Sequence, residues 1–249
     1  MRRESYRDRA LVVRTYDFGE ADRIIVLLTR NHGLRRGVAK GVRRSKSRFG
    51  SRLQHFVDID VQLYPGRNLE SITGADTVAY YGSGIIDDYE RYTAACAALE
   101  CAERLAATDG DEDPWLFDHL TETLARMQES DHPTLVLDAF LLQAMGHAGW
   151  APSLFDCAQC GAPGPHHAFH PAVGGAACVN CRPSGSAEVP EEALHLMWLL
   201  AHSHWPAILS TAASSDGGHL LAVAHRLTRA HLQWHLEQKV TSLTVMDQF

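Results

Sequence analysis

The sequence VDIDVQL, residues 57–63, decides the fold class of the first part of the chain. Apolar and polar residues alternate strictly from Val57 to Leu63, which is the period of a β-strand with one buried and one wetted face. Other apolar runs of strand length surround it, separated by turn residues such as those of 31–33 and 65–68. We expect five strands, near residues 10–16, 23–30, 34–41, 53–64 and 69–80.

Five short strands with a basic surface are typical of an OB-fold barrel, a common small scaffold for oligonucleotides. An SH3-like or another small barrel remains an alternative, because the number of strands alone does not fix their topology. We expect this β-barrel to occupy residues 1–82.

Charge is distributed unevenly along the 249 residues, although the formal net charge is only −7. Residues 1–70 hold 16 Lys and Arg against 8 Asp and Glu, whereas residues 71–249 hold 7 against 22. From Arg23 to Val57 there are ten cationic residues and no acidic one. Such a segment indicates a phosphate-rich ligand. The acidic residues 71–249 reduce non-specific binding of the rest of the chain to such ligands. The alternative is a solvated charged loop.

The densest part of this segment, residues 34–52, holds eight cations. Arg36, Val38 and Lys40 alternate as one face of a strand does, whereas the Gly, Ser and paired cations beyond Gly41 predict a mobile loop. Serine hydroxyls there are neutral donors to phosphate. Three aromatic side chains are candidates to stack on bases: Tyr16, Phe18 and Phe49.

From Asp87 the apolar period changes to about 3.6, which predicts a helical body over residues 83–152 and 186–249. One expected stripe consists of Tyr89, Tyr92, Cys96, Leu99 and Ala102. A second helix should begin with Asp113 as N-cap and Pro114 as first residue. The remaining helices are expected at 134–148, which should be central in the core, at 191–205 and at 220–240.

Four of the six cysteines form two Cys-x-x-Cys pairs, Cys157 with Cys160 and Cys178 with Cys181. This spacing is typical of a closed four-thiolate zinc site, so we expect one structural Zn²⁺ in an inserted, zinc-ribbon-like module over residues 153–185. A catalytic zinc and a redox dithiol are the alternatives, and His166, His167 or His170 is a less favoured replacement ligand.

Sequence motifs of enzymes are absent, including the phosphate-binding loop, the dinucleotide fingerprint, HExxH and GxSxG. An acidic cluster, Asp109, Asp111, Glu112 and Asp113, suggests a two-metal nuclease as an alternative, but its glycine and proline neighbours favour a solvated turn. We therefore do not expect an enzyme.

The chain has no run of 18 apolar residues and no apolar segment behind its first charges, so we expect neither a membrane span nor a secretory signal. Paired cysteines in a leaderless chain favour a reducing compartment. The expected location is the cytoplasm.

Several stretches closely resemble the opening of the RecO family of bacterial recombination mediators: ALVVR (10–14), YDFGEADRII (16–25), LTRNHG (28–33) and VAKGVRRSKSR (38–48). The resemblance continues through the helical body and the CAQCG knuckle at 157–161, and becomes loose over residues 241–249.

The resemblance implies an α+β, multi-domain chain with an N-terminal OB-fold, a helical body and a zinc module. It implies a mediator in RecF-pathway DNA repair that binds single- and double-stranded DNA and anneals complementary strands. The partners it implies are RecR, the C-terminal tail of single-strand-binding protein and, indirectly, RecA nucleoprotein, at the nucleoid. For that acidic tail, Arg104 and Arg126 are the candidate cations.

We expect nine cations of the N-terminal unit to contact DNA: Arg14, Arg35, Arg36, Lys40, Arg43, Arg44, Lys46, Arg48 and Arg52. An RNA-binding OB-fold protein and a metal-dependent nuclease remain the alternative functions.

Overall fold

The computed structural model describes residues 4–107, 113–236 and 239–246. Contacts divide the chain into two compact units, Met1–Asp131 and His132–Phe249. The first two helices therefore belong to the same unit as the strands that precede them. The three-part division at residues 82, 152 and 185 stays a prediction.

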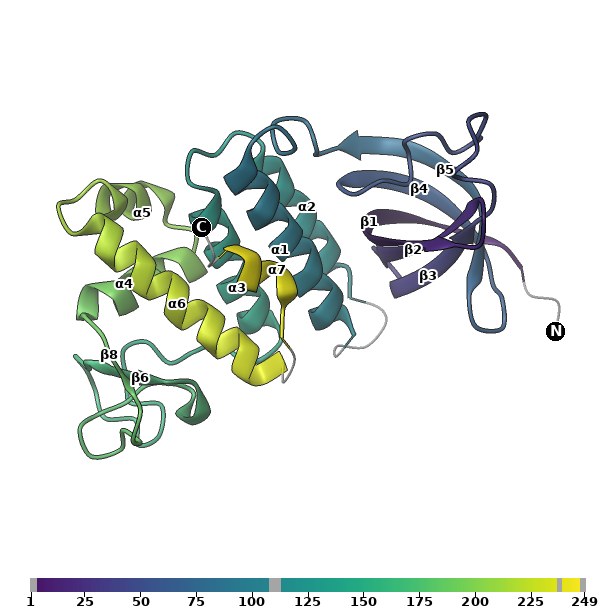
Figure 1. Cartoon of the computed structure of the whole chain (residues 1–249). Helices are drawn as coiled ribbons and strands as arrows, with labels where there is room; N and C mark the ends of the chain where they lie inside the picture. Colours follow the sequence, from purple (N-terminus) through teal and green to yellow (C-terminus); the bar gives the residue numbers. More distant parts are fainter. Residues whose placement is uncertain (1–3, 108–112, 237–238, 247–249) are drawn as a thin grey trace. The chain divides into compact units, whose positions relative to one another are not determined.

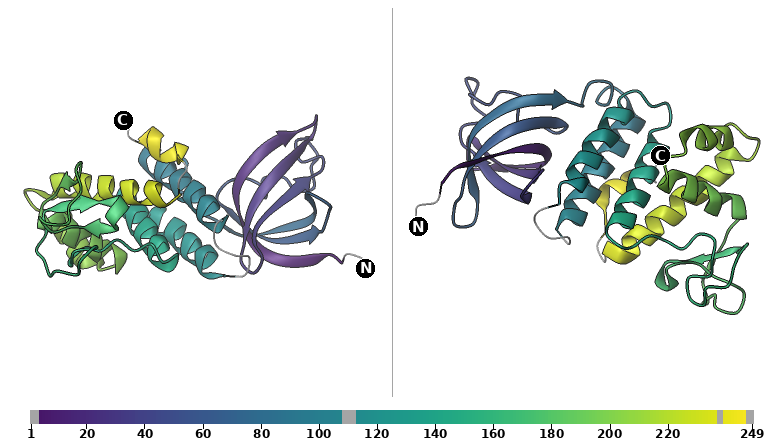
Figure 2. Two further views of the ribbon diagram at one scale, coloured as in Figure 1. Left: turned by 90° about the horizontal axis from the view of Figure 1, so that it is seen from below. Right: turned by 180° about the vertical axis from the view of Figure 1, so that it is seen from behind.

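The first unit contains a closed five-stranded barrel (Figure 1). Its strands are β1 (Tyr6–Phe18), β2 (Asp22–Thr29), β3 (Gly33–Ala39), β4 (Val57–Tyr64) and β5 (Glu70–Tyr80). The order is β1-β2-β3-β5-β4, closed by antiparallel pairing of β1 with β4, and only the contact of β3 with β5 is parallel. This OB-like barrel, whose closure is visible from below and behind in Figure 2, confirms the expected fold class.

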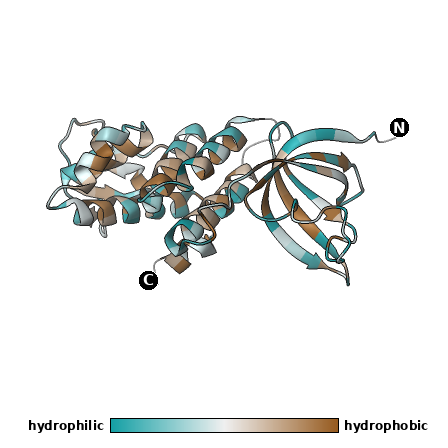
Figure 3. Ribbon diagram, turned by 90° about the horizontal axis from the view of Figure 1, so that it is seen from above, coloured by the Kyte–Doolittle hydropathy of each residue, from teal (hydrophilic) through white to brown (hydrophobic). Residues whose placement is uncertain are grey.

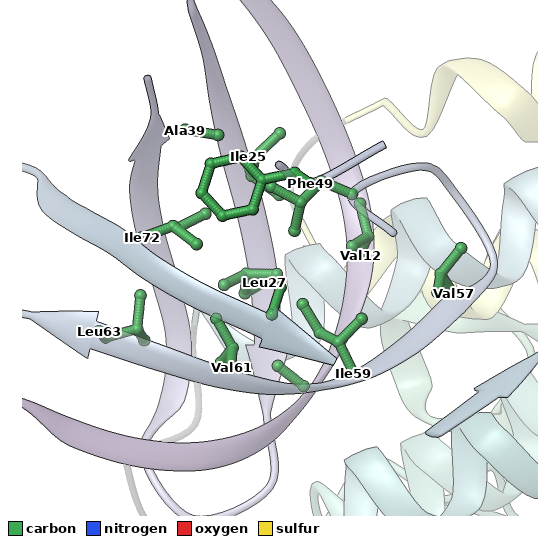
Figure 4. Packing of buried hydrophobic residues seen from close by; sticks show 13 residues of the cluster. Val12, Ile25, Leu27, Ala39, Phe49, Val57, Ile59, Val61, Leu63 and Ile72 are labelled. Atoms are coloured by element: carbon green, nitrogen blue, oxygen red, sulfur yellow. The ribbon is translucent and has the colours of Figure 1, made fainter. Parts of the chain in front are cut away.

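Alternate residues of β1, β2 and β4 fill the barrel, as the period of two requires, and Ala39 of β3 with Ile72 and Ala75 of β5 completes its core (Figure 4). Ile25 and Leu27 of β2 face Ile59, Val61 and Leu63 of β4 within one buried cluster. A glycine is needed among them at position 37, because a Cβ there would lie 2.7 Å from Cγ1 of Ile72.

The outer face of β1 and β2 is also buried, through Leu11, Val13, Val26 and Leu28. In the same unit, α1 (Tyr89–Ala106) packs against β1, β2 and β3, and α2 (Trp115–Met127) packs against β1. The buried face of α1 is rich in alanine, which allows close approach. The expected stripe was wrong at its start, because Tyr89 and Tyr92 are 54% and 41% exposed.

The second unit contains α3 (Pro133–His147), α4 (Glu191–Ala201), α5 (Trp205–Ala212), α6 (Gly217–Leu236) and α7 (Thr241–Met246). Between α3 and α4 lies a small sheet of β6 (Ala168–His170), β7 (Gly175–Ala176) and β8 (Ala187–Glu188), with a short 3-10 helix at Pro171–Val173. As expected, α3 is central, since it packs against both α4 and α6. Hydrophobic residues dominate α3. Along the chain, helices and strands carry both hydrophobic and hydrophilic residues (Figure 3).

Several expected boundaries were wrong. The helix expected over 191–205 is two helices, because Ser203 adopts a positive φ of 55° and ends the first of them. Strand β4 begins at Val57 rather than at residue 53. Helix α2 begins at Trp115, although the Asp113 carboxylate still accepts a hydrogen bond from the Trp115 backbone N–H at 2.9 Å.

Residues 40–56, which we call the basic loop, connect β3 to β4. Phe49 and Leu53 from this loop belong to the barrel core, and Figure 4 shows the Phe49 ring beside Ile25 and Ile72. Two expectations are therefore corrected. The loop is packed onto the barrel rather than extending freely, and Phe49, only 2% exposed, is not available to stack on a base.

We predict that Phe49→Ala lowers the free energy of unfolding by about 3 to 5 kcal/mol, because it leaves a cavity in the barrel core. The measurement is urea denaturation followed by circular dichroism. Phe18→Ala is the matched control, since Phe18 is 46% exposed and its loss should change stability little. Equal unfolding midpoints for the two variants would contradict the assignment of Phe49 as the anchor of the loop.

Candidate nucleic-acid interface and metal centre

Seven of the nine cations expected to contact DNA are exposed and lie on β3 and the basic loop: Arg36, Lys40, Arg43, Arg44, Lys46, Arg48 and Arg52. Six of these, all except Arg43, have no carboxylate within ion-pair distance in the part of the chain that the structure describes. Exposed cations without protein counterions are the arrangement that phosphate binding requires.

The turn between β1 and β2 holds the start of the basic loop. The Arg43 backbone N–H donates to the Ala21 carbonyl at 3.0 Å, and the Gly41 N–H donates to the Asp22 carboxylate at 2.7 Å. The Asp17 carboxylate lies 2.9 Å from Nε of Arg23 and 3.4 Å from the Arg43 guanidinium. The hydrogen bond from Arg23 lowers the pKa of Asp17, and the charge of Arg43 adds to this effect.

Two of the expected aromatic candidates, Tyr16 and Phe18, lie on either side of Asp17 and are 44% and 46% exposed. They are therefore close in the chain to the carboxylate that contacts Arg43 of the basic loop. Their stacking on bases stays a prediction.

Two of the nine cations lie in different surroundings. Arg14 contacts α1, with Nε 2.6 Å from Glu103 and a terminal nitrogen 3.7 Å from Glu100. Arg35 lies 3.9 Å from Glu70. The structure thus gives Arg14 two carboxylate counterions from α1, whereas Arg43 alone among the cations of the basic loop pairs with a described carboxylate, and the contact of Arg14 with DNA stays a prediction.

Sequence reasoning missed a further ion pair between the barrel and α2. Arg30 donates twice to Asp118, both hydrogen bonds being 2.8 Å long. The hydrogen bonds from Arg30 lower the pKa of Asp118. The only sequence signal was an aspartate on the first turn of an expected helix, which does not indicate a partner 88 residues away.

The four cysteines of the two pairs come together in the second unit, with their sulfurs all within 4.8 Å of one another. Zinc–thiolate bonds of about 2.3 Å in a tetrahedron place the sulfurs about 3.8 Å apart. The sulfurs of Cys160 and Cys178 are separated by 3.8 Å, far longer than a disulfide bond. The arrangement can therefore hold a metal ion.

Backbone turns and hydrogen bonds position the four cysteines of this cluster. Each Cys-x-x-Cys pair closes a turn, with the Gly161 N–H donating to the Cys157 carbonyl and the Cys181 N–H donating to the Cys178 carbonyl. Gly161 has φ of +71°, which a residue with a Cβ rarely adopts. In addition, the Cys178 N–H points to the Cys157 sulfur at 3.4 Å.

The charges of the cluster also fit a cation. Backbone N–H groups of Cys178 and Cys160 lower the pKa of Cys157 to about 6, whereas hydrogen bonds to the neighbouring thiols raise the pKa of Cys181 to about 12. Four thiols this close cannot all ionise on their own, because each negative charge opposes the next. A divalent ion removes that opposition, and soft sulfur donors select metals such as zinc.

Two of the three histidines considered as ligands have other partners. The His166 ring donates to the Ala162 carbonyl at 2.9 Å, and Nδ1 of His170 accepts from the Ala172 N–H at 3.1 Å. Among the described residues, only the four cysteines form a cluster suited to a metal.

Helix α6 packs against the segment that holds the four cysteines. The buried His231 ring contacts Phe169 of β6 and donates to the Trp150 carbonyl at 2.8 Å. Burial lowers the pKa of His231 to about 4, so the ring is neutral at physiological pH.

Of the acidic cluster that suggested a nuclease, Asp109, Asp111 and Glu112 lie outside the described residues. Asp113 is exposed and accepts a hydrogen bond from the Trp115 N–H, whereas the N-cap of α2 is Pro114 and not Asp113 as expected. No described helix combines the length and apolar character that crossing a membrane requires.

The fold and the two sites define an OB-barrel protein that joins a basic loop to a helical body with a metal-binding module. Comparison with protein families agrees with this description. The family model "Recombination protein O N terminal" matches residues 1–81, and "Recombination protein O C terminal" matches residues 86–244. The chain therefore belongs to the RecO family of recombination mediators in DNA repair, as the sequence resemblance indicated.

We predict that acidification destabilises the second unit through His231. The pKa of His231 is about 4 in the folded protein and about 6.5 in the unfolded chain. The neutral, buried ring therefore contributes fully to the free energy of unfolding above pH 6.5, and this contribution is lost as the pH falls towards 4. Between pH 7.5 and 5 the loss is about 2 kcal/mol. Urea denaturation of the parent and of His231→Gln at both pH values measures it.

The substitution removes this titration and keeps a donor for the Trp150 carbonyl, so the variant should lose less stability between the two pH values. All other titrating groups are common to both proteins. Equal losses in parent and variant would show that His231 does not carry the effect.

Proposed function

We propose that this protein is a non-enzymatic mediator that binds single- and double-stranded DNA and anneals complementary strands. The observation that carries the proposal is the set of exposed cations on β3 and the basic loop of an OB-like barrel. Proteins of this fold commonly bind oligonucleotides, and phosphate contacts provide affinity without reading the sequence.

Annealing follows from the same chemistry. Two complementary strands repel each other through their phosphates, and a row of cations lowers this repulsion by displacing counterions from both. The step forms base pairs and breaks no covalent bond, so it needs no nucleophile, general base or catalytic metal. This supports a role as a mediator rather than an enzyme.

The metal we propose for the cysteine cluster is one structural Zn²⁺, held by Cys157, Cys160, Cys178 and Cys181. Four thiolates fill a tetrahedron and leave no open position for a substrate. The ion would supply folding energy to the surrounding loops, whose sheet is formed by strands of only two or three residues.

The family membership supports three protein partners, which we also propose here. With RecR, the protein helps to load RecA onto DNA coated by single-strand-binding protein, at the nucleoid in the cytoplasm. The acidic tail of single-strand-binding protein needs a cationic contact. Arg104 and Arg126 remain the candidates, with Arg104 one-third exposed and 3.7 Å from Glu100.

We predict that replacing Arg35, Arg36, Lys40, Arg43, Arg44 and Arg48 by Ala weakens DNA binding irrespective of sequence. Each lost phosphate contact removes about one unit from the slope of log K against log salt. Fluorescence anisotropy with labelled oligonucleotides at several salt concentrations measures the slope, and annealing rates should fall in parallel.

The matched control replaces two exposed cations of the second unit, Arg182 and Arg226, by Ala. It should retain the parent's affinity and slope. If the variant with all six substitutions also retains them, β3 and the basic loop are not the DNA-binding surface.

We predict that freshly purified protein contains one zinc ion per chain, measurable by elemental analysis. Cys157→Ser or Cys178→Ser should lower metal content and thermal stability more than DNA affinity, because the ion stabilises the module and does not contact DNA. Cys101→Ser is the matched control, since this buried cysteine lies outside the cluster. A full-length protein without bound metal would contradict the proposal.

A further inference from the structure

A pocket of about 300 Å³ opens on the first unit. It lies where β5 ends, α1 begins and the basic loop leads into β4; Figure 1 shows β5 running into the connection to α1. The lining side chains come from these segments and from β1 and β2: Thr15, Arg23, Gln54, His55, Phe56, Tyr80, Ile86 and Tyr92. This volume is at the small end of the range of ligand sites, which suits a single ring system and not an oligonucleotide.

Aromatic rings form much of the wall. The Phe56 ring contacts Tyr92 edge-on at a centroid distance of 6.0 Å and lies 6.2 Å from the His55 ring. Tyr80 and Tyr92 are 46% and 41% exposed, so their rings remain accessible to a ligand. Aromatic walls of this kind bind flat rings by stacking.

The backbone at Phe56 is held in an unusual conformation. Its φ of 66° is left-handed, which is unfavourable for a bulky residue. The Phe56 carbonyl accepts a hydrogen bond from the Tyr81 N–H at 2.9 Å, which fixes this conformation to the end of β5. Such conformations persist where the surrounding structure enforces them, and they concentrate at binding sites.

The pocket also offers polar groups to the edge of a ring. Nε2 of His55 is buried and has no hydrogen-bond partner among the described residues. Gln54 is exposed beside it and provides both a donor and an acceptor. Burial lowers the pKa of His55, which favours the neutral form of its ring. An unpartnered buried nitrogen costs free energy that a bound ligand can recover.

The charge of the pocket selects the kind of ligand. None of the described residues that line it is acidic, and Arg23 forms part of its wall, with Nε 2.9 Å from the Asp17 carboxylate. Gln54, His55 and Phe56 are the last three residues of the basic loop, so the pocket continues from the loop along the chain. A ligand that joins an aromatic ring to a phosphate backbone is complementary to both features.

We infer that this pocket takes one unstacked base of single-stranded DNA whose phosphates lie along the basic loop. Tyr80 and Tyr92 stack on the base, and Gln54 and His55 contact its edge. The inference rests on the proposed DNA binding and adds to it a site that distinguishes single strands from duplex. In a duplex the bases are paired and stacked within the helix, so the pocket contributes only to single-strand binding.

The test compares Tyr80→Ala and Tyr92→Ala with the parent, using oligothymidylate and a duplex of equal length in fluorescence anisotropy. Each variant should weaken single-strand binding on the order of tenfold and leave duplex binding and the salt slope unchanged. Tyr80→Phe keeps the ring and should restore affinity. Tyr64→Ala is the matched control, because Tyr64 is 45% exposed on β4 and lies outside the pocket.

Thermal melting of each variant establishes that the fold is retained, which the exposure of both rings favours. Unchanged single-strand affinity in both variants would overturn the inference, and so would an equal loss for single strand and duplex. Either result leaves the proposed function intact as long as the variant with all six cation substitutions on β3 and the basic loop loses DNA binding. If that variant binds normally, the proposed function itself fails.

Discussion

The burial of Phe49 and Leu53 in the barrel core is the interaction on which the basic loop depends. The segment from Arg23 to Val57 has ten cations and no acidic residue, so its charges repel one another in the folded chain. Burying a large apolar side chain stabilises the fold by about 1.5 to 3 kcal/mol, which offsets part of this repulsion. Two such anchors within five residues fix the loop on the barrel and leave its cations at the surface.

The helices of the first unit determine which cations remain available. Helices α1 and α2 cover the outer face of β1 and β2, and their carboxylates occupy Arg14 and Arg30. Among the described residues, no carboxylate of α1 or α2 forms an ion pair with Arg36 or with Lys46 of the basic loop. A single strand that follows these free cations would pass from phosphate contacts to the aromatic pocket where the loop ends.

Local patterns in the sequence were sufficient for the barrel and the metal cluster. The alternation of VDIDVQL fixes one strand, and the spacing of the two cysteine pairs fixes a cluster of four sulfurs, since both signals lie within short segments. Contacts between distant segments were not predictable in the same way. The burial of Phe49, the pairing of Arg30 with Asp118 and the exposure of Tyr89 depend on which surfaces meet after the chain folds.

We propose that DNA lies on the barrel unit, along β3 and the basic loop. The most direct measurement is ultraviolet cross-linking of the full-length protein to a photoreactive single strand, followed by mass spectrometry of the linked peptides. We expect cross-links concentrated in residues 33–56 and at Tyr80 or Tyr92. Cross-links confined to residues 132–249 would contradict it.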